Sequence, residues 1–161
     1  MRSALKVVAV GLFVAGVLAA QSSHGYAFVA PGGVSASGVT EATLHGGGGF
    51  EALVWRRWAG VGAEVGWLGP IKRLGSGVGV LSPNGYFHFG GDRMRGIDPF
   101  VTVGYTMFFR RDTDSLFNFG AGLNWWFRDK AGLKFEFRDH VDKESRLTAH
   151  FWSFCFGVTF R

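Results

Sequence analysis

Six ionisable residues lie at alternate positions of segments whose other face is apolar: Glu51, Glu64, Lys134, Glu136, Arg138 and His140. Carboxylates beside a histidine and two cations could act as general acids and bases, or could line a gated polar path. The same residue types also form structural networks when they are buried together, because an unpaired buried charge is strongly unfavourable. We expect the structural role, with the three glutamates arranged around Arg138 and Lys134, and no catalytic residue.

The spacing of the remaining residues does not indicate a metal site, a nucleophile and base pair, or a phosphate-binding loop. His88, His140 and His150 could be ligands or bases, yet His, Cys and carboxylates show no metal-ligand spacing. His150 and Ser153 are three residues apart, so in a strand they point to opposite faces and cannot form a nucleophile and base pair. The glycine run 46–49 is not followed by Lys-Ser or Lys-Thr, which argues against a phosphate-binding loop. The sequence therefore predicts no metal or other cofactor.

The elements that carry these residues alternate in the manner of β-strands. In the last stretch, 148–161, one set of alternate residues is Trp152, Phe154, Phe156, Val158 and Phe160, and the other set is mostly small or polar. A soluble sheet buries its apolar face, whereas a membrane barrel turns that face to lipid and keeps polar residues inside. Glycine opposite aromatic residues on most segments favours the membrane barrel.

Eight alternating segments follow one another, at about 25–34, 40–54, 59–69, 77–90, 98–109, 116–127, 132–141 and 148–161. Pro31 is expected to break the first segment and Pro83 weakens the fourth, because proline lacks the backbone donor of a strand ladder. Residues 69–75 are expected to form a loop. Single-chain bacterial barrels have an even number of strands, and each segment can cross a bilayer when tilted. The predicted fold is all-β, an eight-stranded antiparallel up-and-down transmembrane β-barrel with an N-terminal signal peptide.

The beginning of the chain reads as a secretory signal. Arg2 and Lys6 precede an uncharged apolar run, 7–20, that ends in small residues. We expect a signal peptide at 1–20, cleaved just before Gln21, with cleavage after Ala19 also compatible with the pattern. Cleavage after Ala27 would remove part of the first expected strand, and the alternative to a cleaved signal is an uncleaved N-terminal anchor. The barrel domain would then be 21–161, in the bacterial outer membrane.

Composition excludes some partners. The chain has 17 basic and 12 acidic residues, a net charge of +5. Removal of Arg2 and Lys6 leaves 15 against 12, or +3, which is too mild to indicate nucleic acid. Cys155 is the one cysteine in the sequence, so no intramolecular disulfide can form, and we expect its side chain to be packed in the lumen rather than reactive.

Four runs resemble small bacterial outer-membrane β-barrel domain proteins: Gly46-Gly47-Gly48-Gly49-Phe50-Glu51, Val61-Gly62-Ala63-Glu64-Val65-Gly66, Asp98-Pro99-Phe100-Val101-Thr102-Val103-Gly104-Tyr105 and Lys134-Phe135-Glu136-Phe137-Arg138-Asp139-His140. The last is similar to a Leu-Arg-Phe-Glu-Phe-Arg-Asp-His pattern near the end of some members. The resemblance covers about 24–161 and implies an envelope barrel of structural or adhesion-related kind, without specifying an activity. Such barrels often end in an aromatic residue, whereas this chain ends Phe160-Arg161.

We expect a monomer whose partners are the lipid bilayer, the outer-membrane assembly machinery during insertion, and lipopolysaccharide. The basic loop residues Lys72, Arg73, Arg110 and Arg111 could meet lipopolysaccharide phosphates or could be ordinary solvated charges.

The leading functional hypothesis is a non-enzymatic protein, structural or a narrow conduit. One alternative resembles the small lipid A deacylases and acyltransferases, although a His-x-Ser pair is absent from the sequence. The other is a soluble secreted barrel whose aromatic face points inward around an apolar ligand.

Overall fold

The computed structural model describes residues 22–36, 39–54, 58–90, 96–110, 113–142 and 149–161. The predicted signal peptide, 1–20, lies outside these residues and stays a prediction. The sequence also predicts turns near 55–58 and 91–96 and loops near 35–38, 110–115 and 142–147, and parts of these lie outside the described residues too. No helix within the described residues is both long and apolar enough to cross a membrane.

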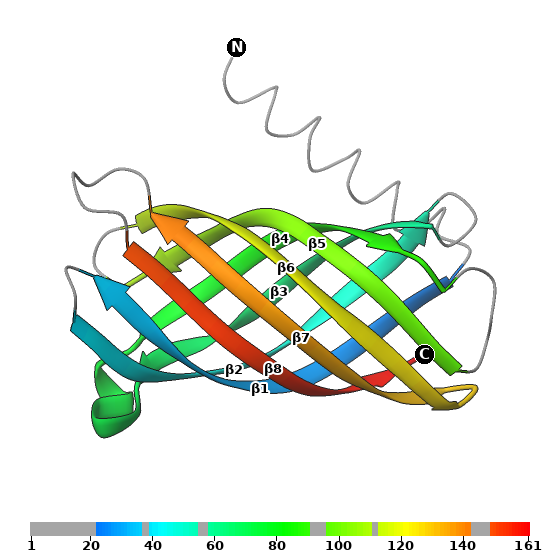
Figure 1. Cartoon of the computed structure of the whole chain (residues 1–161), viewed down its shortest axis with the longest axis horizontal. Helices are drawn as coiled ribbons and strands as arrows, with labels where there is room; N and C mark the ends of the chain where they lie inside the picture. Colours follow the sequence, from blue (N-terminus) through cyan, green and yellow to red (C-terminus); the bar gives the residue numbers. More distant parts are fainter. Residues whose placement is uncertain (1–21, 37–38, 55–57, 91–95, 111–112, 143–148) are drawn as a thin grey trace, which may run out of the picture.

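Eight strands and one short 3₁₀ helix make up the described chain (Figure 1). They are β1 (Ser22–Ala36), β2 (Val39–Val54), β3 (Ala59–Pro70), η2 (Ile71–Ser76), β4 (Val78–His88), β5 (Gly96–Phe109), β6 (Thr113–Arg128), β7 (Ala131–Asp142) and β8 (Ala149–Phe160). Each strand pairs antiparallel with the next, and β1 pairs with β8, so the sheet closes on itself. The predicted eight-stranded up-and-down barrel is confirmed.

The alternation of side chains also follows the prediction. In β6, Asn118 and Asn124 are fully buried, whereas Phe119 and Trp125 are 46% and 48% exposed. The same pattern recurs in β8, where Ser153 and Cys155 are buried and Phe154 and Phe156 are each 50% exposed. A lumen that is polar and an outer wall that is aromatic are typical of a membrane barrel. This is the reverse of the soluble alternative, in which the aromatic face would enclose a ligand.

The prediction that Pro31 breaks the first strand is wrong, because β1 continues through it to Ala36. Pro31 pairs with Leu44 of β2, while the pairing of β1 with β8 passes from Val29 to Gly32 without it. Pro83 is accommodated in the same way: it pairs with Ala63 of β3 and is passed over by the β4–β5 ladder. The backbone N–H that each proline lacks is therefore missing only where the pairing with the neighbouring strand, β8 for Pro31 and β5 for Pro83, is already interrupted.

The second difference between the expectation and the structure concerns residues 69–75, which were expected to form a loop. Gly69 and Pro70 complete β3, and η2 begins at Ile71. The other strands differ from the expected segments by a few residues at their ends, where turn residues interrupt the alternation of polar and apolar side chains.

Glycine at inward positions lets neighbouring strands and lumen side chains approach closely. A Cβ atom built on Gly62 would lie 3.2 Å from both the Cα of Glu51 and the ring of Tyr86, and closer still to the carbonyl oxygen of Phe50. Backbone atoms cannot move away as a flexible side chain can. The small residue is therefore required by packing at this position.

We expect Gly62→Ala to lower the free energy of unfolding by about 1–3 kcal/mol, as overpacking of a tight core does. Gly85→Ala is the matched control, because a Cβ atom there meets nothing nearer than the Val103 carbonyl oxygen at 3.7 Å. Urea titration of both variants in lipid vesicles, followed by tryptophan fluorescence, measures the difference. Equal midpoints for the two variants would refute the packing argument.

The barrel has two ends that differ in what they carry. The terminal rim contains the beginning of β1 and the end of β8, where Gly25 pairs with Phe160. The distal rim contains η2 and the ends of β1, β3, β5 and β7 (Figure 1). Exposed aromatic side chains gather toward each rim: Trp58, Phe87, Phe89, Trp125, Phe127 and Phe160 near the terminal rim, and Trp67, Tyr105, Phe109 and Phe117 near the distal rim. Two such bands correspond to the aromatic girdles at the two membrane interfaces.

Candidate functional site

The central lumen is organised around the guanidinium group of Arg138. Arg138 extends inward from β7 and donates from Nη1 to Glu64 Oε1 at 2.9 Å and from Nε to Glu136 Oε1 at 2.6 Å. The three side chains are almost completely buried. The planar fork of arginine can serve two carboxylates at once, which makes it suited to a buried network. Arg138 thereby ties β7 to β3 across the interior.

Lys134 belongs to the same central group of buried charges as Arg138, Glu64 and Glu136. Its Nζ lies 3.1 Å from Glu136 Oε2 and 4.0 Å from the centre of the Phe100 ring, with the rings of Tyr26 and Tyr86 at 4.8 and 5.2 Å. Its side chain is fully buried. One carboxylate and three aromatic faces thus replace the water that the ammonium group loses.

The two tyrosines extend the central group by hydrogen bonds. Tyr26 donates its hydroxyl proton to Glu64 Oε2 at 2.9 Å, and the hydroxyl groups of Tyr26 and Tyr86 are 3.0 Å apart. Because the Tyr26 proton is directed to Glu64, Tyr86 must be the donor to Tyr26. Two glutamates balance one arginine and one lysine here, so the central group is neutral in total.

Glu51 lies in a different group, near the terminal rim. Its Oε1 contacts His88 Nε2, and its Oε2 is 3.3 Å from His24 Nε2. His88 Nδ1 in turn lies 2.9 Å from Asp98 Oδ2. Both ring nitrogens of His88 therefore face carboxylates, and both can donate only when the ring carries two protons. The structure thus places Glu51 among histidines, whereas the sequence-based expectation placed it around Arg138.

His140, the sixth residue of the expected network, lies apart from the ion pairs. Its Nδ1 is 3.0 Å from the carbonyl oxygen of Phe151, and its ring centre is 6.3 Å from that of Phe108. Cys155 is buried and free, packed with Tyr26, Phe28 and Ala30. Both residues contribute to packing in the lumen.

Apolar side chains fill the lumen toward its distal end. Val80, Phe108 and Leu116 form a buried cluster, against which Leu68 and Phe151 pack. A cavity beside this cluster has a volume of about 10 Å³, which is about the space of a single water molecule. At the terminal end, Trp126 is 2% exposed. The guanidinium group of Arg161 stacks over its ring at 3.8 Å. An eight-stranded barrel is just wide enough for such filling.

His150 and Ser153 point to opposite sides of β8, as expected: His150 is exposed on the outer wall, and Ser153 is buried in the lumen. His150 Nδ1 lies 2.8 Å from Asp139 Oδ2. Ser35 is opposite His150 in the β1–β8 ladder, but its hydroxyl group is hydrogen-bonded to that of Thr40 at 3.1 Å. The described residues show no hydrogen bond between a serine and a histidine.

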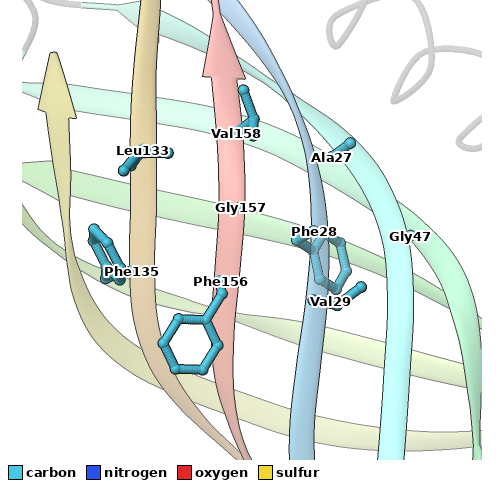
Figure 2. A pocket seen from close by; sticks show the side chains of 9 residues that line it. All are labelled: Ala27, Phe28, Val29, Gly47, Leu133, Phe135, Phe156, Gly157 and Val158. Carbon is cyan, nitrogen blue, oxygen red and sulfur yellow. The ribbon is translucent and has the colours of Figure 1, made fainter. Parts of the chain in front are cut away.

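The outer wall carries an open apolar depression of about 470 Å³ over β1, β2, β7 and β8 (Figure 2). Ala27, Gly47 and Gly157 contribute little or no side chain there, while Phe135 and Phe156 are bulky. These two rings are 6.0 Å apart and nearly perpendicular. The depression belongs to the lipid-facing belt and contains no group that could carry out chemistry.

Sequence reasoning missed four lumen residues that the structure adds to the two polar groups: His24, Tyr26, Tyr86 and Asp98. In the fourth expected segment Tyr86 alternates with Ser82, Asn84 and His88, so the sequence predicts that it faces inward but assigns it no partner. Tyr26 lies within the first expected segment, 25–34, and His24 would have joined the same face had that segment been extended to Ser22. Within the described residues, no group of three or more His, Cys, Asp or Glu side chains could hold a metal ion.

No protein-family model and no curated protein matches the sequence. Solved structures are similar in fold. The N-terminal β-barrel domain of Pseudomonas aeruginosa OprF superposes with a TM-score of 0.63 at 18% identity, covering 86% of this chain and 95% of that one. Neisserial surface protein A, NspA, gives 0.62 at 10% identity, covering 86% and 96%. OprG from Pseudomonas aeruginosa gives 0.52 at 11% identity, covering 88% and 96%.

The closed barrel and these similarities together define the class of protein. The chain has the fold of the small eight-stranded bacterial outer-membrane β-barrels. At these identities the similarity concerns the fold alone, because one fold can serve many different functions.

Proposed function

We propose that this protein is an outer-membrane β-barrel with a closed lumen and a structural, non-enzymatic role in the cell envelope. The observation that carries the proposal is the filled interior. The Arg138 and Glu51 groups occupy its centre and terminal end, and the cluster around Phe108 occupies its distal end. A conduit would need a continuous path for water, and this packing leaves little room for one.

The outer wall supports the membrane location. Side chains such as Val29, Val65 and Val103 are at least half exposed around the middle of the barrel, between the two aromatic girdles. Exposed apolar surface of this extent is unfavourable in water and favourable in lipid. The bilayer is accordingly the main partner. We further propose a monomer that is inserted by the outer-membrane assembly machinery and is in contact with lipopolysaccharide.

The absence of enzymatic activity is part of the proposal. A serine nucleophile must lie within hydrogen-bond reach of its base, and in the described residues neither Ser35 nor Ser153 has such a contact with His150. The His150 and Asp139 pair is more simply a surface ion pair on the outer wall. Within the part of the chain that the structure describes, no contact favours the lipid-modifying alternative over the structural one.

We expect the full chain, expressed in a Gram-negative host, to fractionate with the outer membrane and to migrate differently in SDS gels before and after heating. The purified barrel is expected to produce no conductance steps in planar lipid bilayers. The gel shift tests the membrane barrel, and the conductance tests the closed lumen. A porin treated in the same detergent is the positive control for conductance.

Each outcome separates the alternatives. Regular conductance steps would support the narrow conduit in place of the closed barrel. A soluble product without a gel shift would refute the membrane barrel itself. Release of fatty acid from lipid A by the purified protein, abolished by His150→Ala, would support the lipid-modifying enzyme.

A further inference from the structure

The short helix η2 lies on the outside of the barrel at the distal rim. It follows β3 directly and contacts both β3 and β2, so it projects beside the wall rather than over the lumen (Figure 1). None of its six residues is buried. The segment is therefore placed at the level where the distal aromatic girdle ends.

Hydrogen bonds from the barrel hold η2 in this position. Trp67, an exposed girdle residue of β3, donates its indole N–H to the carbonyl oxygen of Leu74 at 2.9 Å. Arg110, at the end of β5, donates from Nη1 to the carbonyl oxygen of Ser76 at 2.6 Å. Within the segment, Ser76 Oγ donates to the carbonyl oxygen of Arg73 at 2.7 Å. The barrel thus holds the segment that presents Lys72 and Arg73 at two points, and the internal hydrogen bond stabilises the turn itself.

The exposed side chains of η2 are of two kinds. Ile71 and Leu74 are apolar and 50% and 43% exposed. Lys72 and Arg73 are basic and exposed, and no ion pair joins them to a carboxylate among the described residues. Glu41 of β2 is an acidic residue of the same edge, since Thr43 pairs with Pro70. With Arg110 included, three basic residues stand against two acidic residues, Glu41 and Asp114, the latter opposite Phe108 at the end of β5.

We propose that η2 is an interfacial segment that binds the phosphate groups of an anionic lipid headgroup. Lys72 and Arg73 would contact the phosphates, Arg110 would add a further donor, and Ile71 and Leu74 would enter the edge of the apolar layer. Apolar and basic side chains on one anchored segment, at an aromatic girdle, match a membrane interface better than bulk water. The inference rests on the proposed membrane function and names the segment that would bind the anionic lipid.

The test uses the full barrel refolded into phosphatidylcholine vesicles that contain fluorescent lipid A. Energy transfer from the protein's tryptophans to the label reports the binding of lipid A. We expect Lys72→Gln combined with Arg73→Gln to weaken the apparent binding at least about fivefold. High salt should reduce the difference, because it screens exposed charges.

Arg128→Gln combined with Lys130→Gln is the matched control. These residues are exposed at the terminal rim and remove the same charge from the opposite end of the barrel. Full binding by the control and weak binding by the η2 variant support the proposal. Equal binding by both variants, or an equal loss in both, overturns it. Failure of the unmodified protein to give a heat-shifted band in any vesicle would instead refute the membrane function on which the inference rests.

Discussion

Arg138→Ala is expected to lower the free energy of unfolding by about 3–5 kcal/mol, the usual effect of removing one partner from a buried ion pair. The alanine would leave Glu64 with a hydrogen bond from Tyr26 alone, and Glu136 with Lys134 alone. Both carboxylates would remain in an interior that water reaches poorly. The measurement is urea unfolding in lipid vesicles, followed by the heat-sensitive gel shift and by tryptophan fluorescence.

Arg128→Ala is the matched control for this prediction, because Arg128 is exposed at the end of β6. We expect that change to alter stability by no more than a few tenths of a kcal/mol, as for most exposed sites. Arg138→Lys should recover part of the loss, since it restores a charge but not two directed hydrogen bonds. An unfolding midpoint for Arg138→Ala equal to that of the unchanged protein would mean that the ion pairs do not stabilise the barrel.

The second large effect concerns the outer wall. Val103 is 50% exposed near the middle of β5, where lipid is expected to surround the barrel. We expect Val103→Arg to lower the free energy of unfolding in vesicles by about 2–4 kcal/mol, the usual effect of arginine at the midplane of a bilayer. In a soluble barrel the same exposed site would accept arginine with little change.

Ile97→Arg provides the comparison along the same strand. Ile97 is 61% exposed and lies at the terminal rim, where a charge can reach water and headgroups. A loss of about 0–1 kcal/mol is expected there. If Val103→Arg and Ile97→Arg had the same small effect, the wall at Val103 would not face hydrocarbon and the membrane proposal would fail.

The two substitutions test the two faces of the barrel wall. Arg138→Ala changes the inner face, and Val103→Arg changes the outer face. The inner face is stabilised by charges that satisfy one another, and the outer face by transfer of apolar side chains into lipid. A barrel built in this way needs neither a ligand nor an open lumen to be stable. This agrees with the structural role that we propose, and it leaves the distal rim, with η2, as the place where specificity for a lipid partner can arise.

The candidate site could be predicted in part. Alternation placed Glu64, Lys134, Glu136 and Arg138 on inward positions, and the structure brings these four together. The partners of Glu51 could not be predicted in the same way. Alternation fixes the face of a residue, but the pairing of strands fixes its height in the barrel, and Glu51 is level with His24 in the β1–β2 ladder.

The sequence by itself determined the number of strands, their order and the face of nearly every side chain, because these depend on a local period of two residues and on short connections. Only the tertiary structure decided which residues meet across the lumen, since closure of β1 on β8 and the stagger of the strands are properties of the whole sheet. The continuation of β1 through Pro31 was decided at that level too, by an interruption in the neighbouring ladder. So was the position of η2, which depends on Trp67 and Arg110, brought together by the closed wall.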